Sequence, residues 1–176
     1  MKISETELQG VKVIELEPHR DRRGSFARAY CTEEFKSAGI TCDFVQDNLS
    51  HNHKKNTIRG MHWQQEPYGE DKLIRCISGA IYDVVVDMRE NSPTYRRWFG
   101  IELSAENQKS LFIPKGFAHG YQTLVENAVV YYKVSQSYHP ESAIGIRYND
   151  EKINIKWRDL RCEIIMSEQD KKWELL

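Results

Sequence analysis

Short runs of β-branched and aromatic residues recur along the chain, with glycine, proline or polar residues between them. In residues 81–88, Tyr82, Val84 and Val86 alternate with Asp83 and Val85. A period of two places successive side chains on opposite faces of an extended strand. Turn residues flank this run on both sides, at positions 79 and 91–93. The same reasoning predicts strands over residues 11–16, 73–77, 81–88, 98–103, 110–113, 128–134 and 144–148.

Helix signals are few. Thr32 can cap a short helix that runs through Phe35 and Ala38 and stops at Gly39, and Ser167 can open another near the C-terminus. No linker or repeat interrupts the chain. We therefore predict a single domain over residues 1–176, an all-β antiparallel sandwich or barrel of the jelly-roll class with a few short peripheral helices. Edge strands of such a fold can pair, which makes a homodimer plausible.

Composition narrows the class of protein. The chain has 176 residues, 40% hydrophobic and 29% charged, with a net charge of −1, which excludes a disordered chain and argues against a nucleic-acid binder. No apolar run is long enough for a membrane span, and no signal peptide is visible. The four cysteines are widely spaced, without a C-x-x-C pair, so we expect reduced thiols and a cytoplasmic protein with no membrane partner.

Two histidines stand in unusual surroundings. The first is in Arg59-Gly60-Met61-His62-Trp63-Gln64, where glycine lets the backbone approach a ligand and Arg59 can bind a phosphate or carboxylate. A strand histidine satisfied by hydrogen bonds is the alternative interpretation of His62. The second is His119 in Pro114-Lys115-Gly116-Phe117-Ala118-His119, which matches the Pro-x-Gly-x-x-His signature of cupin jelly rolls.

A metal site is not expected. Metal-binding cupins carry His-x-His followed by a glutamate, but here Trp63 and Gln64 follow His62, and Lys72 lies ten residues on. His51-Asn52-His53 is followed by no carboxylate, so the ligand set for zinc or iron is incomplete.

Metal-free proton chemistry fits the remaining residues better. Removal of a proton next to a carbonyl needs a base such as His62, and the resulting enolate needs a cation or a donor, which Lys72 or His119 can supply. A tyrosine can return the proton from the opposite face. If Val130 and Val134 face inward with Tyr132, the residues between them face outward; core packing with a satisfied hydroxyl remains the alternative for each tyrosine.

The chain resembles the dTDP-4-dehydrorhamnose 3,5-epimerase family of sugar-nucleotide enzymes over nearly its whole length. The matching segments include Asp21-Arg22-Arg23-Gly24-Ser25-Phe26, Gln46-Asp47-Asn48-Leu49-Ser50, Arg59-Gly60-Met61-His62-Trp63-Gln64, Lys72-Leu73, Ile113-Pro114-Lys115-Gly116-Phe117-Ala118-His119-Gly120, Tyr132-Lys133, Tyr138-His139-Pro140-Glu141 and Ser167-Glu168-Gln169-Asp170.

The resemblance implies a metal-free cupin without a cofactor, usually a homodimer, that epimerises a nucleoside-diphosphate-linked 4-keto-6-deoxyhexose for deoxysugar and polysaccharide biosynthesis. It implies His62 as the base, Asp170 as its dyad partner, Tyr132 as the acid and Lys72 near the C4 oxygen. The implied substrate contacts are Arg23, Phe26, Arg28, Gln46, Asn48, Arg59, His119 and Tyr138, of which Arg23 reaches for the diphosphate or the partner subunit's site and Tyr138 for the base.

The chain departs from the family pattern at Arg28, Glu70, Ala143 and Gln169. We assign most of these departures to nucleotide or dimer contacts and not to the catalytic set. Arg28 has two interpretations, a diphosphate contact and a surface salt bridge. The identity of the nucleotide (dTDP, CDP or GDP) and the choice between C3, C5 or both stay open. A 3,4-ketoisomerase, a non-catalytic sugar-nucleotide binder and a metal-dependent oxygenase are the competing hypotheses.

Overall fold

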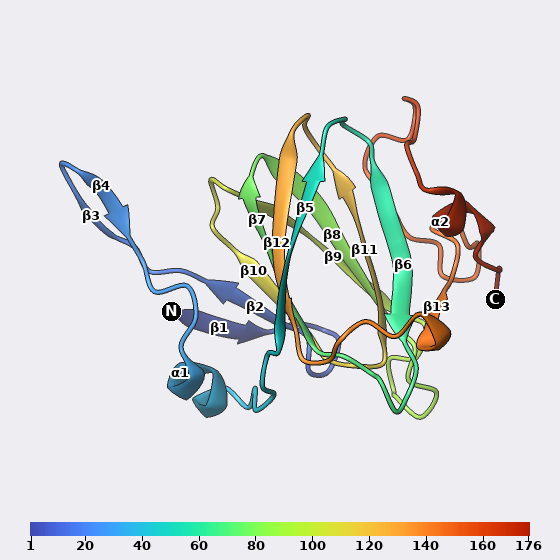
Figure 1. Cartoon of the computed structure of the whole chain (residues 1–176), viewed down its shortest axis with the longest axis horizontal. Coiled ribbons are helices and arrows are strands. Elements are labelled where there is room, and N and C mark those ends of the chain that lie inside the picture. The colour runs from blue at the N-terminus through green and yellow to red at the C-terminus, as the bar shows by residue number, and fades with distance from the viewer.

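Two antiparallel β-sheets, packed face to face, make up most of the computed structural model, which describes residues 1–176 (Figure 1). One sheet has the strand order β1-β2-β10-β7-β12-β5 and the other β13-β6-β11-β8-β9. The strands of the first sheet are β1 (Lys2–Glu5), β2 (Lys12–Glu15), β5 (Gln46–Asn52), β7 (Lys72–Ser78), β10 (Ser110–Ile113) and β12 (Ala128–Val134). Those of the second are β6 (Ile58–Gln64), β8 (Ala80–Asp87), β9 (Trp98–Ser104), β11 (Phe117–Thr123) and β13 (Ala143–Gly145).

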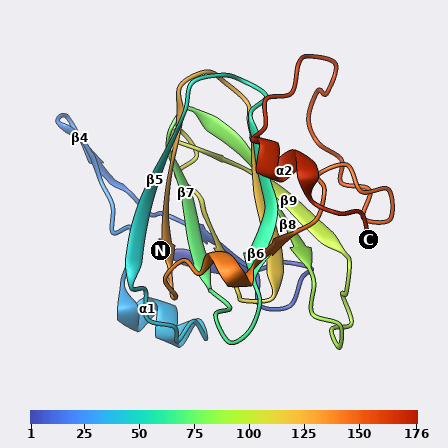
Figure 2. The same cartoon turned by 45° about the vertical axis from the view of Figure 1, so that its right-hand side comes forward.

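The space between the sheets holds the main apolar core at one end. Ile74 and Val130 of the first sheet meet Ile81, Val85 and other buried side chains of the second. Two further clusters cover the outer faces: the segment after β13 packs on the five-stranded sheet, and the helix α1 (Thr32–Ser37) packs on the six-stranded sheet. Figures 1 and 2 show α1 and the second helix, α2 (Glu168–Lys172), on opposite sides of the sheets. The all-β jelly-roll prediction is confirmed.

Each of the seven predicted strands has a counterpart in the structure, with shifts at the ends. The alternation in β8 is confirmed, because Tyr82, Val84 and Val86 belong to the outer cluster whereas Ile81 and Val85 belong to the core between the sheets. The predicted strand at 144–148 is shorter, Ala143–Gly145. Strands β1, β5, β6 and β11, and the hairpin described below, were not predicted, since their sequences are polar or interrupted by glycine.

Of the two predicted helices, one has the expected cap. In α2 the Ser167 side chain accepts a hydrogen bond from the Asp170 amide at 3.0 Å. The cap assigned to Thr32 is wrong, because Thr32 is the first helical residue of α1 and Cys31 takes the cap position without a side-chain hydrogen bond. Gly39 follows that helix with a φ of 79°, in the left-handed region that glycine favours.

A hairpin of β3 (His19–Asp21) and β4 (Gly24–Phe26) stands apart from both sheets. It projects well beyond them in Figures 1 and 2 and pairs only with itself. All of its strand residues are exposed, and the Phe26 side chain is 75% accessible.

None of the helices is long and apolar enough to cross a membrane. The cysteines Cys31, Cys42, Cys76 and Cys162 are all free thiols.

Candidate active site

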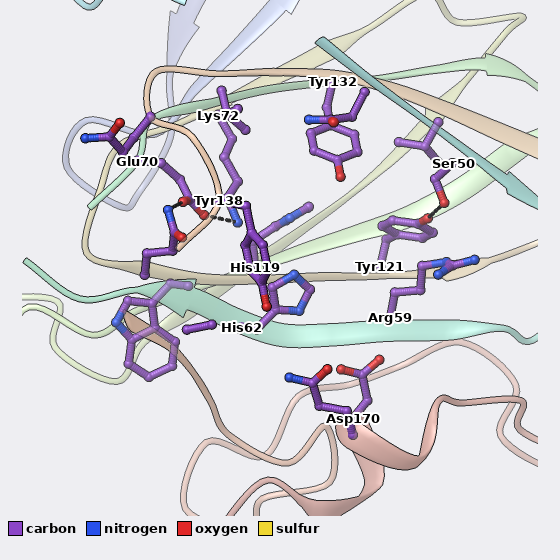
Figure 3. Close-up of a pocket in the computed structure, with 18 of the residues that line it drawn as sticks. Ser50, Arg59, His62, Glu70, Lys72, His119, Tyr121, Tyr132, Tyr138 and Asp170 are labelled. Atoms are coloured by element: carbon purple, nitrogen blue, oxygen red, sulfur yellow. Dashed lines mark hydrogen bonds and ion pairs between the residues drawn. The ribbon is translucent and has the colours of Figure 1, made fainter. Parts of the chain in front are cut away.

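A cavity of about 590 Å³ opens between the two sheets, at the end away from the apolar core. Its walls come from β5, β7 and β12 on one side and from β6 and β11 on the other, and the C-terminal segment around α2 adds to the rim. Figure 3 shows the polar side chains that converge on this space. The chain therefore has a polar pocket of a size suited to a small-molecule ligand.

His62 and His119 form one wall of the cavity. They are directly opposite in the β6–β11 ladder, and both line the cavity. Two positions along, Tyr121 of β11 pairs with Arg59 of β6, so β6 carries one extra residue between the two pairs. Residues three apart in a regular strand face opposite sides, and this β-bulge lets Arg59 and His62 both face the cavity. Gly60 sits in the bulge, where a side chain would meet the His119 carbonyl oxygen at 2.5 Å.

His119 is anchored from behind by a buried carboxylate. Its Nε2 lies 2.9 Å from Asp83 Oδ1, and Asp83 is completely buried in β8. The second carboxylate oxygen of Asp83 has no hydrogen-bond partner. The imidazole is thus held in one orientation by a charge that the protein otherwise leaves unpaired.

The His62 side chain, by contrast, makes no hydrogen bond or ion pair with any protein group. Burial, together with the positive charges of Lys72, His119 and Arg59, lowers the pKa of His62 to about 3. The imidazole is therefore neutral near neutral pH, which is the state that a proton acceptor requires.

Asp170 lies in α2 on the rim of the same cavity, but the hydrogen bond expected of a His62–Asp170 dyad is absent. The Asp170 carboxylate instead accepts a hydrogen bond from Trp173 Nε1 at 3.2 Å. The two side chains line one cavity, as Figure 3 shows, but they form no direct hydrogen bond in this structure.

Tyr132 and Lys72 stand on the opposite wall. Val130, Tyr132 and Val134 all line the cavity, whereas Tyr131 donates to Asp47 on the outer side, which confirms the alternation predicted for this strand. Burial raises the pKa of the Tyr132 hydroxyl, so it stays protonated and able to donate. The Lys72 ammonium is buried and pairs with Glu70 at 2.8 Å.

The remaining predicted contacts divide into two groups. Gln46, Asn48, Arg59 and Tyr138 all line the cavity. Gln46 donates to Asn48 at 2.9 Å, and Asn52 accepts a hydrogen bond from Arg59 Nε at 2.8 Å, which orients the guanidinium. Tyr138 is 61% exposed at the mouth, where an aromatic ring can stack on a ligand.

Arg23, Phe26 and Arg28 do not line the cavity of their own chain. Arg23 pairs with Asp21 in the projecting hairpin, and its side chain is 86% exposed. Arg28 bonds Glu34 at 2.7 Å, which is the surface salt bridge considered for it above. In the isolated chain these three residues are outside the site.

Three of the four departures from the family pattern, Glu70, Ala143 and Gln169, line the cavity. Glu70 bonds Lys72 directly and so lies beside one of the predicted catalytic residues. Reasoning from the sequence also missed Tyr121 and Trp173. A signal for part of this wall exists in β5, where polar residues alternate at 46, 48, 50 and 52, the reverse of an apolar inner face.

No group of three or more His, Cys, Asp or Glu side chains is arranged to bind a metal ion. The donor set that faces the cavity suits an organic ligand with oxygen acceptors: it has a guanidinium, an ammonium, two imidazoles, amides and three phenols.

Comparison with known proteins agrees with this geometry. The family model described as dTDP-4-dehydrorhamnose 3,5-epimerase matches residues 5–176. The chain is 42% identical to dTDP-4-dehydrorhamnose 3,5-epimerase of Escherichia coli over 173 residues, which cover 98% of this chain and 92% of that protein.

Solved structures give the same result. The structure of dTDP-4-dehydrorhamnose 3,5-epimerase from Bacillus anthracis with TDP and PPi bound superposes with a TM-score of 0.95 at 41% identity, covering 99% of both chains. An epimerase from Legionella pneumophila in complex with dTDP-4-keto-L-rhamnose superposes with a TM-score of 0.93 at 38% identity, covering 99% of this chain and 92% of that one. The chain belongs to the dTDP-4-dehydrorhamnose 3,5-epimerase family.

Proposed function

We propose that this chain epimerises a dTDP-linked 4-keto-6-deoxyhexose at C3 and C5, as an isomerase of dTDP-rhamnose biosynthesis. One observation carries the proposal: His62 and Tyr132 face the same cavity from opposite sheets. A sugar ring between the two walls would present one face to a base and the other to an acid. Inversion at a carbon needs this arrangement, because the proton leaves from one face and returns to the other.

The proposed reaction begins with proton removal by the neutral His62 imidazole from a carbon next to the C4 ketone. The electron pair moves onto the ketone oxygen as an enolate, which Lys72 stabilises with its positive charge. Tyr132 then donates its hydroxyl proton to the opposite face of the same carbon, and solvent restores both groups. C3 and C5 flank the same ketone, so the same three residues serve both carbons when the ring readjusts.

The binding residues divide the cavity between sugar and nucleotide. In this proposal Arg59, oriented by Asn52, holds the diphosphate, while Gln46 and Asn48 contact the nucleoside and Tyr138 stacks on the base. His119, fixed by Asp83, lines the sugar pocket. The dTDP and dTDP-sugar ligands of the B. anthracis and L. pneumophila structures support this class of substrate.

Incubation with the dTDP-linked 4-keto sugar in deuterated buffer tests the function. Deuterium at both C3 and C5 is expected, and NMR of the product reads both positions. Label at one carbon makes the chain a mono-epimerase, and a keto group moved to C3 makes it a ketoisomerase. The absence of label at both carbons refutes the proposal. CDP- and GDP-linked sugars in parallel measure the nucleotide preference, which we expect to favour dTDP.

We also propose a homodimer in which the projecting hairpin reaches the partner's cavity. The support is its isolation from both sheets, the exposed Phe26 and Arg23, and exposed apolar residues on the outer face of β5 and β7, Leu49 and Ile77 among them. Light scattering should give twice the chain mass. Mixing two inactive variants, Arg23→Ala and His62→Asn, should restore activity, because a mixed dimer has one site free of both changes. No recovery after confirmed exchange of subunits contradicts this arrangement.

A cytoplasmic location and a role in polysaccharide assembly complete the proposal. Four free cysteines suit a reducing compartment.

A further inference from the structure

Glu70 is a buried carboxylate in the cavity that the proposed reaction does not use. Its side chain is 10% exposed, and that of Lys72 is 8% exposed, with Glu70 Oε1 and Lys72 Nζ 2.8 Å apart. Figure 3 shows this pair among the residues of the cavity wall. Burial of a charge is costly unless it is paired, so each of these groups depends on the other.

The second oxygen of Glu70 is held from the other side. It accepts a hydrogen bond from Gln64 Nε2, and Gln64 is itself fixed to the main chain. The His139 amide donates to Gln64 Oε1 at 2.5 Å, and Gln64 Nε2 also donates to the Ser137 carbonyl at 3.1 Å. Glu70 therefore cannot turn away from Lys72 without loss of its hydrogen bond to the fixed Gln64 amide.

This arrangement gives Lys72 a defined direction. A lysine ammonium on its four-carbon stem is flexible and has three N–H donors. Glu70 takes one donor and leaves the others for an acceptor in the cavity. Stabilisation of an enolate oxygen is most effective when the donor is in place before the charge forms.

Glu70 also changes the charge balance around His62. The charged and titratable groups that share the cavity with His62 are Arg59, Glu70, Lys72, His119, Tyr121, Tyr132, Tyr138 and Asp170. Lys72, His119 and Arg59 oppose protonation of His62 through their positive charge. Because Glu70 pairs with Lys72, it offsets one of these charges when His62 takes up a proton.

We propose that Glu70 is a positioning residue for the proton transfer, which directs the Lys72 ammonium toward the keto oxygen and offsets the charge of Lys72 at His62. The proposal rests on the epimerase function above and adds to it a role for a residue at which this chain departs from the family pattern.

Glu70→Gln tests the proposal with little change in size. The glutamine carbonyl can still accept from Gln64, but its amide then presents a donor to Lys72 in place of an acceptor. We expect kcat to fall roughly 10–100-fold, since the loss of a preorganised donor acts on the transition state, with KM little changed. The acid limb of the kcat/KM profile should move to lower pH, because the loss of the negative charge makes His62 harder to protonate.

Glu70→Asp keeps the charge and shortens the side chain, so its kcat should fall while its acid limb stays at the wild-type position. Glu66→Gln is the matched control, since Glu66 pairs with Lys115 at the same 2.8 Å but on the surface. That variant should keep the wild-type kcat and pH profile. Thermal melting and dTDP titration establish that each variant is folded and binds.

A Glu70→Gln enzyme with wild-type kcat, or with reduced kcat and an unshifted acid limb, overturns the role of Glu70. If that variant does not fold, a shifted acid limb in Glu70→Asp overturns it instead. Failure of the wild type to incorporate deuterium at C3 and C5 is a different result, which refutes the epimerase function itself.

Discussion

His62 and His119 are neighbours in one β-ladder and face the same cavity, yet the protein treats them in opposite ways. His119 is bonded to a completely buried carboxylate, whereas His62 has no hydrogen bond or ion pair to the protein. The anchored imidazole has a fixed orientation. The unbonded imidazole is free to accept a proton from a ligand, at the cost of a weak basicity caused by burial and nearby cations.

Two residues of the same type on the same wall of the cavity therefore need not have the same role. In the proposed reaction, His119 lines the sugar pocket and is fixed by its bond to Asp83, whereas His62 acts as the base and no side-chain bond holds it. Substitution of either histidine tests this contrast.

His62→Asn should have the largest effect. We expect kcat for deuterium incorporation at C3 and C5 to fall roughly 1,000-fold, because loss of a general base costs about that much. Stability at neutral pH should change by less than about 1 kcal/mol, since no protein hydrogen bond is lost. NMR of the washed-in label and thermal melting measure the two quantities. Wild-type exchange in this variant would remove His62 as the base.

His119→Asn should mainly lower the stability of the protein, whereas His62→Asn mainly lowers kcat. The asparagine amide stops short of Asp83, so the buried carboxylate loses its one side-chain partner. Removing one member of a buried pair costs about 3 kcal/mol. Urea unfolding measures this loss. His119→Gln is the control, because its longer amide reaches toward Asp83 and should recover part of the stability; equal losses in both variants would contradict the anchoring role.

Acid stability should separate the two histidines again, by a smaller amount. The pKa of His62 is about 3 in the folded chain, below its unfolded value of 6.5, so the unfolded state binds more protons between these values. Stability therefore falls as pH drops through this window, with a slope of up to about 1.4 kcal/mol per pH unit. His62→Asn removes this term and should be about 1–2 kcal/mol less sensitive at pH 4.5, a figure reduced because the cavity admits solvent.

Asp87 also makes the stability of the chain sensitive to acid, and it is unchanged in His62→Asn. Hydrogen bonds from Arg89, Ser92 and Thr94 outweigh the effect of burial and lower the pKa of Asp87 to about 2. Its contribution is also lost in acid, but it is present in both proteins and cancels in the comparison. Equal acid sensitivity of wild type and His62→Asn in urea titrations at several pH values would contradict a neutral, buried His62.

The strands with regular runs of apolar residues, and the inward face of β12, could be predicted from the sequence. Strands β2, β7, β8, β9, β10, β12 and β13 are of this kind. Tyr132 was placed correctly from the alternation in β12, and Ser167 was recognised as a cap from its position before an acidic turn. Strand β5 was missed because its inward residues are polar, so the usual signal is reversed where a strand lines a pocket.

The orientation of Arg59 and His62 could not be predicted from a periodic pattern. Their spacing of three predicts opposite faces, and only the bulge at Gly60, formed against β11, brings both to the cavity. The position of Trp173 in the cavity wall, against Gly145, likewise depends on packing between separate segments of the chain.

Trp173→Phe should have the smallest effect and would make His62 more like His119. The Trp173 indole packs against Gly145, where a side chain would meet the ring at 2.4 Å, and its N–H holds one oxygen of Asp170. Phenylalanine keeps a ring against Gly145 but releases the carboxylate, which can then turn toward His62 across the cavity. A carboxylate next to the imidazole favours its protonated form, so the acid limb of kcat/KM should move to higher pH.

The rate at neutral pH should change about 3-fold, on the scale of one hydrogen bond, and we expect the sign of the pH shift to be more telling than its size. Asp170→Asn provides the matched test. If the shift acts through Asp170, adding Trp173→Phe to Asp170→Asn should move the acid limb no further, because the charge that it releases is already gone. An equal shift in both backgrounds would mean that the indole acts on His62 by a route other than Asp170. The Asp170 carboxylate would then not be the group through which Trp173 affects the protonation of His62.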